Sequence, residues 1–130
     1  MTDLKRLDNI GIAVQDLAHA YAFNHDVLGL SAEPPRLEAE GFAAQLGDVA
    51  LYILKTDSTD GLDRTADLPK NPLGLDHLAF EVEDFEAAQR NLEGQDITFI
   101  HAVVGEPGGF RYRGFHDPDG NVIYIIDRGG

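Results

Sequence analysis

Apolar and polar residues alternate along two segments of the chain, and this alternation predicts two matching β-strands. In residues 7–14, large apolar residues recur at every second position and therefore share one face of the strand. Residues 75–82 repeat the pattern 68 positions later, from Leu7 to Leu75. Residues 49–54 and 121–126 form a second matching pair, offset by 72 positions from Tyr52 to Tyr124. The chain therefore consists of two copies of one module.

A helix is expected after the first strand of each copy. Asp16 and Asp84 are placed as N-caps, because a carboxylate accepts hydrogen bonds from the first free N–H groups of a helix. Gly29 and Gly94 are expected to end the two helices. Apolar residues at helical spacing lie between these signals: Leu17, Ala20, Tyr21, Val27 and Leu28, then Phe85, Ala88 and Leu92.

The remaining strands complete each module as β-α-β-β-β, an α+β fold. Residues 42–46 and 49–55 are expected to form a hairpin. In the second copy the expected strands are 97–104, 110–115 and 121–127, with a tight turn at 117–120. We expect one domain over residues 1–130, with module one at 5–55, a polar linker at 56–74 and module two at 75–128.

Composition narrows the classes of partner. A net charge of −13 opposes binding to nucleic acid and to anionic membranes, and it favours a strongly solvated acidic surface. The absence of cysteine excludes disulfides and thiolate chemistry. No apolar signal core and no 18-residue apolar run are present, so a cytoplasmic protein is expected.

The duplicated plan resembles the vicinal oxygen chelate superfamily, which includes glyoxalase I, bleomycin-resistance proteins, extradiol dioxygenases and methylmalonyl-CoA epimerase. The segments that carry the resemblance are residues 7–17, 27–30 and 75–78, and above all the DPDGN turn and strand of residues 117–123. The resemblance implies that each module's mixed sheet curls into a half-barrel with its helix outside and a substrate on the concave face. It also implies a homodimer.

Enzymes of this superfamily hold one divalent metal through side chains at four positions. The resemblance places these positions at Asn9, Tyr52, His77 and Tyr124, and only His77 is a standard ligand. An amide and two phenols are poor donors and supply no charge to neutralise a dication, so no metal or other cofactor is expected. A non-standard divalent metal site built from His77 with Glu81, His101 or His116 is the less favoured alternative.

Strand parity suggests what surrounds these four positions. Gly11 and Ala13 share the face of Asn9, whereas Ala50 and Ala79 lie beside Tyr52 and His77. Small residues below two phenols, an amide and an imidazole are typical of a pocket for an organic ligand. The alternative is that the two tyrosines fill a barrel that has lost its site, with their hydroxyls bonded to His77 and Asn9.

Arg111 and Arg113 lie on the strand before the DPDG turn. Either could bind a carboxylate or phosphate at the rim of the pocket through its fork of donors. The more favoured interpretation is a surface salt bridge in an acid-rich protein. Both remain candidate ligand-binding residues at this point.

Three functions follow, in order of preference. The first is a metal-free protein of the bleomycin-resistance type that binds a small organic molecule, with Asn9, Tyr52, His77 and Tyr124 in the pocket. The second is a lyase, isomerase, epimerase or dioxygenase of the same superfamily, with His77 as base and Tyr52 or Tyr124 as acid. The third is a relic with a closed pocket.

Overall fold

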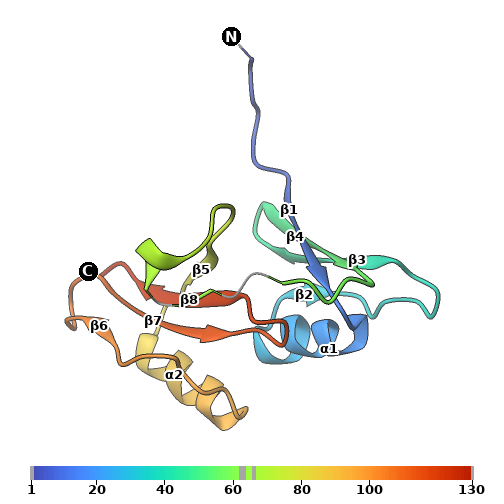
Figure 1. Ribbon diagram of the computed structural model, residues 1–130. Helices are drawn as coiled ribbons and strands as arrows, with labels where there is room; N and C mark the ends of the chain where they lie inside the picture. Colours follow the sequence, from blue (N-terminus) through green and yellow to red (C-terminus); the bar gives the residue numbers. More distant parts are fainter. Residues whose placement is uncertain (1, 62–63, 66, 130) are drawn as a thin grey trace. The chain divides into compact units, whose positions relative to one another are not determined.

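The computed structural model describes residues 2–61, 64–65 and 67–129. The chain divides into two compact units, residues 1–60 (unit 1) and 61–130 (unit 2). Each unit contains one four-stranded mixed sheet with a helix packed on it (Figure 1). That the two form a single domain stays a prediction, and residues 62–63 and 66 of the expected linker lie outside the described residues.

Unit 1 has the sheet order β1-β4-β3-β2, in which β1 runs parallel to β4 and the other neighbours are antiparallel. Its elements are β1 (Asn9–Val14), α1 (Leu17–Tyr21), a π-helical turn η1 (Ala22–Val27), β2 (Ser31–Ala32), β3 (Gly41–Leu46) and β4 (Val49–Lys55). The expected hairpin through Gly47-Asp48 is confirmed by the register of β3 and β4.

Unit 2 repeats this plan with the order β5-β8-β7-β6 and the parallel pair β5–β8. Its elements are a short 3₁₀ turn η2 (Leu68–Lys70), β5 (His77–Glu81), α2 (Phe85–Gly94), β6 (Val104–Gly105), β7 (Arg111–His116) and β8 (Val122–Asp127). The α+β class and the duplicated βαβββ order are confirmed, and neither sheet closes into a barrel.

Both predicted N-caps are confirmed. Asp16 accepts a hydrogen bond from the His19 N–H at 3.0 Å, and Asp84 accepts one from the Ala87 N–H at 2.9 Å. Gly29 adopts a φ of +76°, as expected for the left-handed residue after a helix.

Gly94 is the last residue of α2, as predicted. The left-handed residue after the helix is Asp96, with a φ of +64°, and the next N–H, that of Ile97, donates to the Leu92 carbonyl. One sequence prediction in unit 2 is wrong. Residues 97–104 do not form a continuous strand. Only a bridge at Phe99 and the two-residue β6 pair with β7, because His101, between them, turns its ring onto that strand.

The core of each unit lies between its sheet and its helix. In unit 1, Phe42, Leu51 and Ile53 are buried with Phe23 of η1, and Tyr21 of α1 meets the Phe42 ring edge-on. In unit 2 the equivalent layer is Phe115, Ile123 and Ile125 with Phe85 and Leu92 of α2. The opposite face of each sheet is therefore the one that helices leave uncovered.

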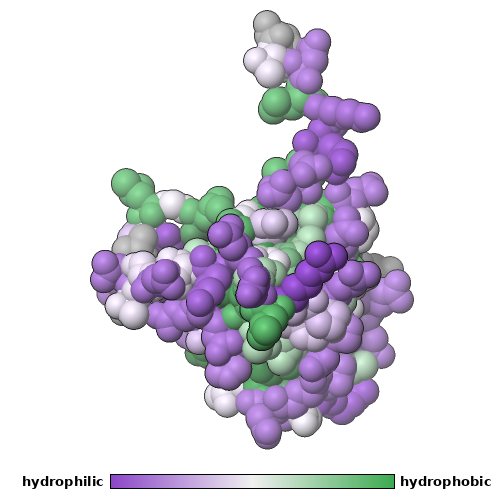
Figure 2. Space-filling model, turned by 90° about the vertical axis from the view of Figure 1, so that its right-hand side faces the viewer, coloured by the Kyte–Doolittle hydropathy of each residue, from purple (hydrophilic) through white to green (hydrophobic). Residues whose placement is uncertain are grey.

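The surface is mainly hydrophilic on the face seen in Figure 2, in keeping with the net charge of −13. Residues before β1 project away from the sheet of unit 1, and Leu4 and Leu7 are exposed (Figure 1). Among the described helices, none has the length and apolar character needed to cross a bilayer.

Candidate functional site

Each sheet places one tyrosine at the centre of a row of small residues. In unit 1, Tyr52 on β4 lies between Gly11 on β1 and Ala43 on β3. In unit 2, Tyr124 on β8 lies between Ala79 on β5 and Gly114 on β7. The face opposite the helix thus repeats the same row in both units, as the strand parity predicts.

The two tyrosines differ in their surroundings. Tyr52 is 44% exposed, whereas Tyr124 is 4% exposed. Three rings of unit 2 surround Tyr124: His77 at 4.7 Å between centroids and perpendicular to it, Tyr112 at 5.4 Å, and His101 at 6.1 Å. Burial raises the pKa of the Tyr124 phenol, and the negative charge of Asp76 and the neighbouring Tyr112 add to the rise. The phenol is therefore neutral at physiological pH.

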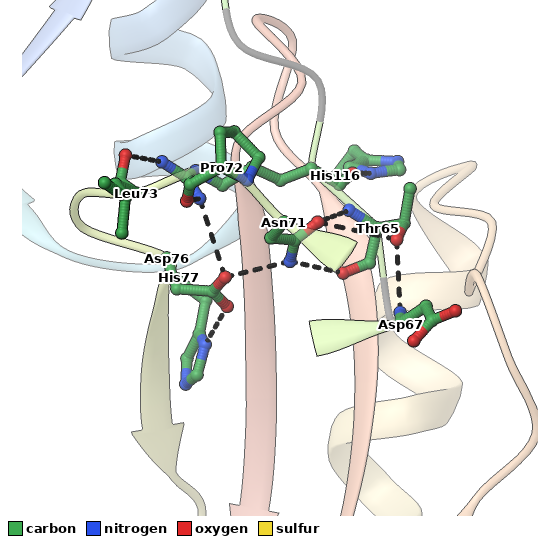
Figure 3. Close-up of polar contacts among 9 residues, drawn as sticks. Thr65, Asp67, Asn71, Pro72, Leu73, Asp76, His77 and His116 are labelled. Carbon is green, nitrogen blue, oxygen red and sulfur yellow. Dashed lines mark hydrogen bonds and ion pairs between the residues drawn. The ribbon is translucent and has the colours of Figure 1, made fainter. Parts of the chain in front are cut away.

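His77 begins β5 and is held by the residue before it. Its Nδ1 lies 2.7 Å from Oδ1 of Asp76, and Nδ2 of Asn71 donates to Oδ2 of the same carboxylate at 2.8 Å (Figure 3). The hydrogen bond from His77, followed by that from Asn71, lowers the pKa of Asp76, although desolvation opposes the change. Asp76 is thus a fixed carboxylate that orients the imidazole.

A folded segment before β5 supports this carboxylate. The guanidinium of Arg64 donates to the Pro72 carbonyl at 2.8 Å and the Leu73 carbonyl at 3.3 Å, and it lies 3.6 Å from Asp76. Asn71 also bonds the backbone of Thr65 in both directions. Sequence reasoning treated residues 56–74 as a linker and missed this role. The available signal was the presence of Arg64 and Asn71 in the segment that leads to His77.

His101 is a second residue whose place the sequence did not reveal. Its Nε2 accepts a hydrogen bond from the Gly114 N–H at 3.1 Å, and its Nδ1 bonds the Ala102 carbonyl at 2.6 Å. Both ring nitrogens are therefore occupied, and the imidazole is neutral with its proton on Nδ1. Its ring packs between Tyr112 and Tyr124, so His101 is a wall of the site.

In unit 1, Asn9 occupies the position that matches His77. Nδ2 of Asn9 donates to Oδ2 of Asp8 at 2.8 Å, and Arg6 pairs with the other oxygen of Asp8 at 3.0 Å. Asn9 shares its face with Tyr52. Within the described residues, neither Tyr52 nor Tyr124 hydrogen-bonds Asn9 or His77 through its hydroxyl.

Arg111 and Arg113 lie on the α2 side of β7. Arg111 pairs with Glu86 at 2.8 Å and Asp127 at 3.0 Å, above the Phe85 ring. Arg113 donates to Gln89 of α2 at 2.8 Å and to the His101 carbonyl at 2.9 Å, above the Phe99 ring. Both guanidinium groups have partners on the face away from Tyr124, so we leave them out of the candidate site.

The donors present do not fit the metal of related enzymes. The protonated, buried phenol of Tyr124 and the amide of Asn9 are weak ligands. Glu81 lies four residues from His77 along β5, roughly 13 Å at about 3.3 Å per residue. Within residues 2–61, 64–65 and 67–129, no group of three or more His, Cys, Asp or Glu side chains is arranged to hold a metal ion.

Comparisons with known proteins agree with the fold. The model of the Glyoxalase/Bleomycin resistance protein/Dioxygenase superfamily matches residues 6–125. The chain is similar to the uncharacterized protein YaeR of Escherichia coli K12, with 32% identity over 98% of this chain and 100% of YaeR. It is also similar to Glyoxylase I 4 of Arabidopsis thaliana, with 28% identity over 95% of this chain and 71% of that protein.

A solved structure shows the same fold. TnmS3, an antibiotic-binding protein from Streptomyces sp. CB03234, superposes with a TM-score of 0.72 at 20% identity, over 99% of this chain and 100% of TnmS3. The family match covers both modules, including β1, β4, β5 and most of β8. The chain therefore belongs to the Glyoxalase/Bleomycin resistance protein/Dioxygenase superfamily.

Proposed function

We propose that this chain binds a small organic molecule without the metal of its enzymatic relatives. The ligand lies against the aromatic face of unit 2, which we define by His77, His101, Tyr112 and Tyr124. The observation that carries the proposal is the position of Tyr124: a buried neutral phenol among three rings stands at one of the four positions where the family resemblance places a metal ligand.

The aromatic face has the character of an organic ligand site. Aromatic side chains offer large contact area with a few polar tips, and such surfaces recur where proteins hold organic molecules. Phe110 extends the surface, since its ring lies 5.8 Å from that of Tyr112 and is half exposed. TnmS3 is named as an antibiotic-binding protein, which supports a binding role on this fold.

A thermal-shift screen of small aromatic compounds tests this proposal. We expect a class of neutral aromatic compounds to raise Tm equally with and without EDTA, and His77→Ala to abolish the shift. Tyr52→Phe is the matched control, since it changes a tyrosine of the other unit and leaves the aromatic face intact. A stoichiometric metal in the purified protein, whose removal abolishes ligand binding, would contradict the proposal. So would the absence of any stabilising aromatic compound.

A second candidate function is proton transfer next to a carbonyl group, as in a lyase or isomerase. The contact of Asp76 with Nδ1 of His77 favours it, because a carboxylate that orients an imidazole is the usual support of a histidine base. Glyoxylase I 4 carries such an activity in its name. Formation of lactoylglutathione from methylglyoxal and glutathione, lost in His77→Ala, would place this function above simple binding.

A homodimer and a cytoplasmic location complete the proposal. The homodimer follows from the family, and its test is light scattering of the purified chain. A monomer at all concentrations used for binding would remove that part without affecting the ligand site of unit 2.

A further inference from the structure

We propose that Asp76 holds the His77 ring with a proton on Nδ1, so that Nε2 accepts a hydrogen bond from a hydroxyl group of the ligand. Arg64 and Asn71 are the positioning residues that hold Asp76 in place. The ligand class that fits is a neutral hydroxyaromatic compound. This inference rests on the proposed binding function and names its ligand class.

The first step is the direction of the hydrogen bond between Asp76 and His77. An ionised carboxylate only accepts hydrogen bonds. Asp76 takes one from Asn71 and lies 3.6 Å from the Arg64 cation, two contacts that favour the charged form. Nδ1 of His77 must therefore be the donor at 2.7 Å, and in the neutral ring Nε2 is then an acceptor.

The second step is the availability of Nε2. The His77 side chain is 33% exposed, and its second ring nitrogen points away from the polar network in Figure 3. Nε2 makes no hydrogen bond to any residue that the structure describes. A lone pair is thus presented beside the ring of Tyr124. His101, by contrast, has both nitrogens bonded to backbone and offers none.

The third step is the charge and shape of the ligand. Tyr112 and His101 are partly exposed and pack against the buried Tyr124 ring, and their rings suit a planar aromatic group. The negative Asp76 that opposes ionisation of Tyr124 also opposes an anionic ligand, and the net charge of −13 acts in the same direction. A neutral aromatic ring carrying a hydroxyl donor meets these conditions.

Unit 1 repeats this contact between an aspartate and the residue after it, with an asparagine in place of the histidine. Asn9 donates from Nδ2 to Asp8, so its Oδ1 is turned away as an acceptor, and Arg6 pairs with Asp8 as Arg64 does with Asp76. Both modules thus use an aspartate to present a hydrogen-bond acceptor at the matching position. The recurrence supports a role for the acceptor beyond local packing in unit 2.

Imidazole ¹⁵N NMR of the full chain tests the tautomer without a ligand. We expect the His77 signals of wild type to show the proton on Nδ1, and Asp76→Asn to move it to Nε2, because the new amide donates to Nδ1. Arg64→Gln and Asn71→Ala should increase the Nε2–H population in part. His101 is an internal reference that stays unchanged, and Asp67→Ala removes an equal charge from the same segment without effect on His77. A wild-type His77 with its proton on Nε2 would overturn the inference.

Two matched probes test the ligand class. 2-Naphthol has a hydroxyl donor, and 2-methoxynaphthalene has the same rings without it. We expect 2-naphthol to bind about 2–12-fold more tightly, the range of one net hydrogen bond, with the difference lost in His77→Phe. Equal binding of both probes would refute the acceptor role of Nε2 while leaving the aromatic-face binding function intact. If neither probe binds, the hydroxyaromatic class is wrong, and the thermal-shift screen decides the binding function separately.

Discussion

Asp8 and Asp76 hold the residues that follow them in the same way, yet their settings differ. Asp8 pairs with Arg6, a side chain 54% exposed and two residues away along the chain. Asp76 pairs with Arg64, whose side chain is 9% exposed. The same guanidinium also donates to two backbone carbonyls of the folded segment before β5. Both modules thus share the aspartate contact, while the segment that supplies the arginine decides how far that contact is shielded from solvent.

The tyrosine rows teach the same lesson from inside the sheets. Tyr52 and Tyr124 have equivalent strand partners, but only Tyr124 is enclosed by rings. His77, whose counterpart in unit 1 is Asn9, is the nearest of these rings, and His101 comes from the irregular stretch between α2 and β6. Equivalent positions in the two modules therefore have different chemistry.

Truncation of the two tyrosines should give the largest difference in the free energy of unfolding between matching positions of the two units. Tyr124→Ala removes a buried aromatic ring and should lower the free energy of unfolding by about 3–5 kcal/mol. Tyr52→Ala removes a half-exposed ring and should cost about 1 kcal/mol or less. Urea unfolding followed by circular dichroism measures both. Equal losses would show that the burial difference does not describe the molecule in solution.

Replacing the glycine of each row with alanine should give a smaller difference in the free energy of unfolding. A Cβ at Gly114 would lie 2.8 Å from Cε1 of Tyr124 and 3.1 Å from Nε2 of His101, whereas one at Gly11 would meet only Leu54 at 3.9 Å. Because the Tyr124 ring is enclosed, Gly114→Ala should destabilise by about 1–3 kcal/mol. Gly11→Ala should change stability by less than about 0.5 kcal/mol. A tolerated Gly114→Ala would mean that Tyr124 can move aside.

The dependence of stability on alkaline pH should give the smallest difference between the two tyrosines. The folded pKa of Tyr124 is raised above its ordinary value of 10.0, so the folded state retains the phenol proton where the unfolded state loses it. The stability that this provides is complete below pH 10 and is lost as the pH rises through the folded pKa. Tyr124→Phe should remove this alkaline loss and Tyr52→Phe should not, as thermal unfolding across this pH range would show. An identical alkaline slope in wild type and Tyr124→Phe would contradict the assignment.

The sequence predicted the duplicated order, both N-caps and the DPDG turn, because these depend on local patterns. Asp117 accepts from the Asp119 and Asn121 N–H groups, a contact that the turn residues themselves provide. It did not predict the failure of the strand at 97–104, since the apolar run there favours a strand until His101 bonds Gly114 across the sheet. The support of His77 was missed for a similar reason. Arg64 and Asn71 contact Asp76 only after the segment folds back on itself.

The folded segment has a consequence for dividing or rearranging this chain. The described residues between 61 and 75 contribute no β-strand, so a cut between them breaks no sheet hydrogen bond and looks harmless by the usual criteria for circular permutation. A fragment that starts at residue 75 would keep all the strands of unit 2 but lose Arg64 and Asn71, and with them the fixed carboxylate beside His77. New termini are better placed at the Gly47-Asp48 hairpin tip, far along the chain from that support.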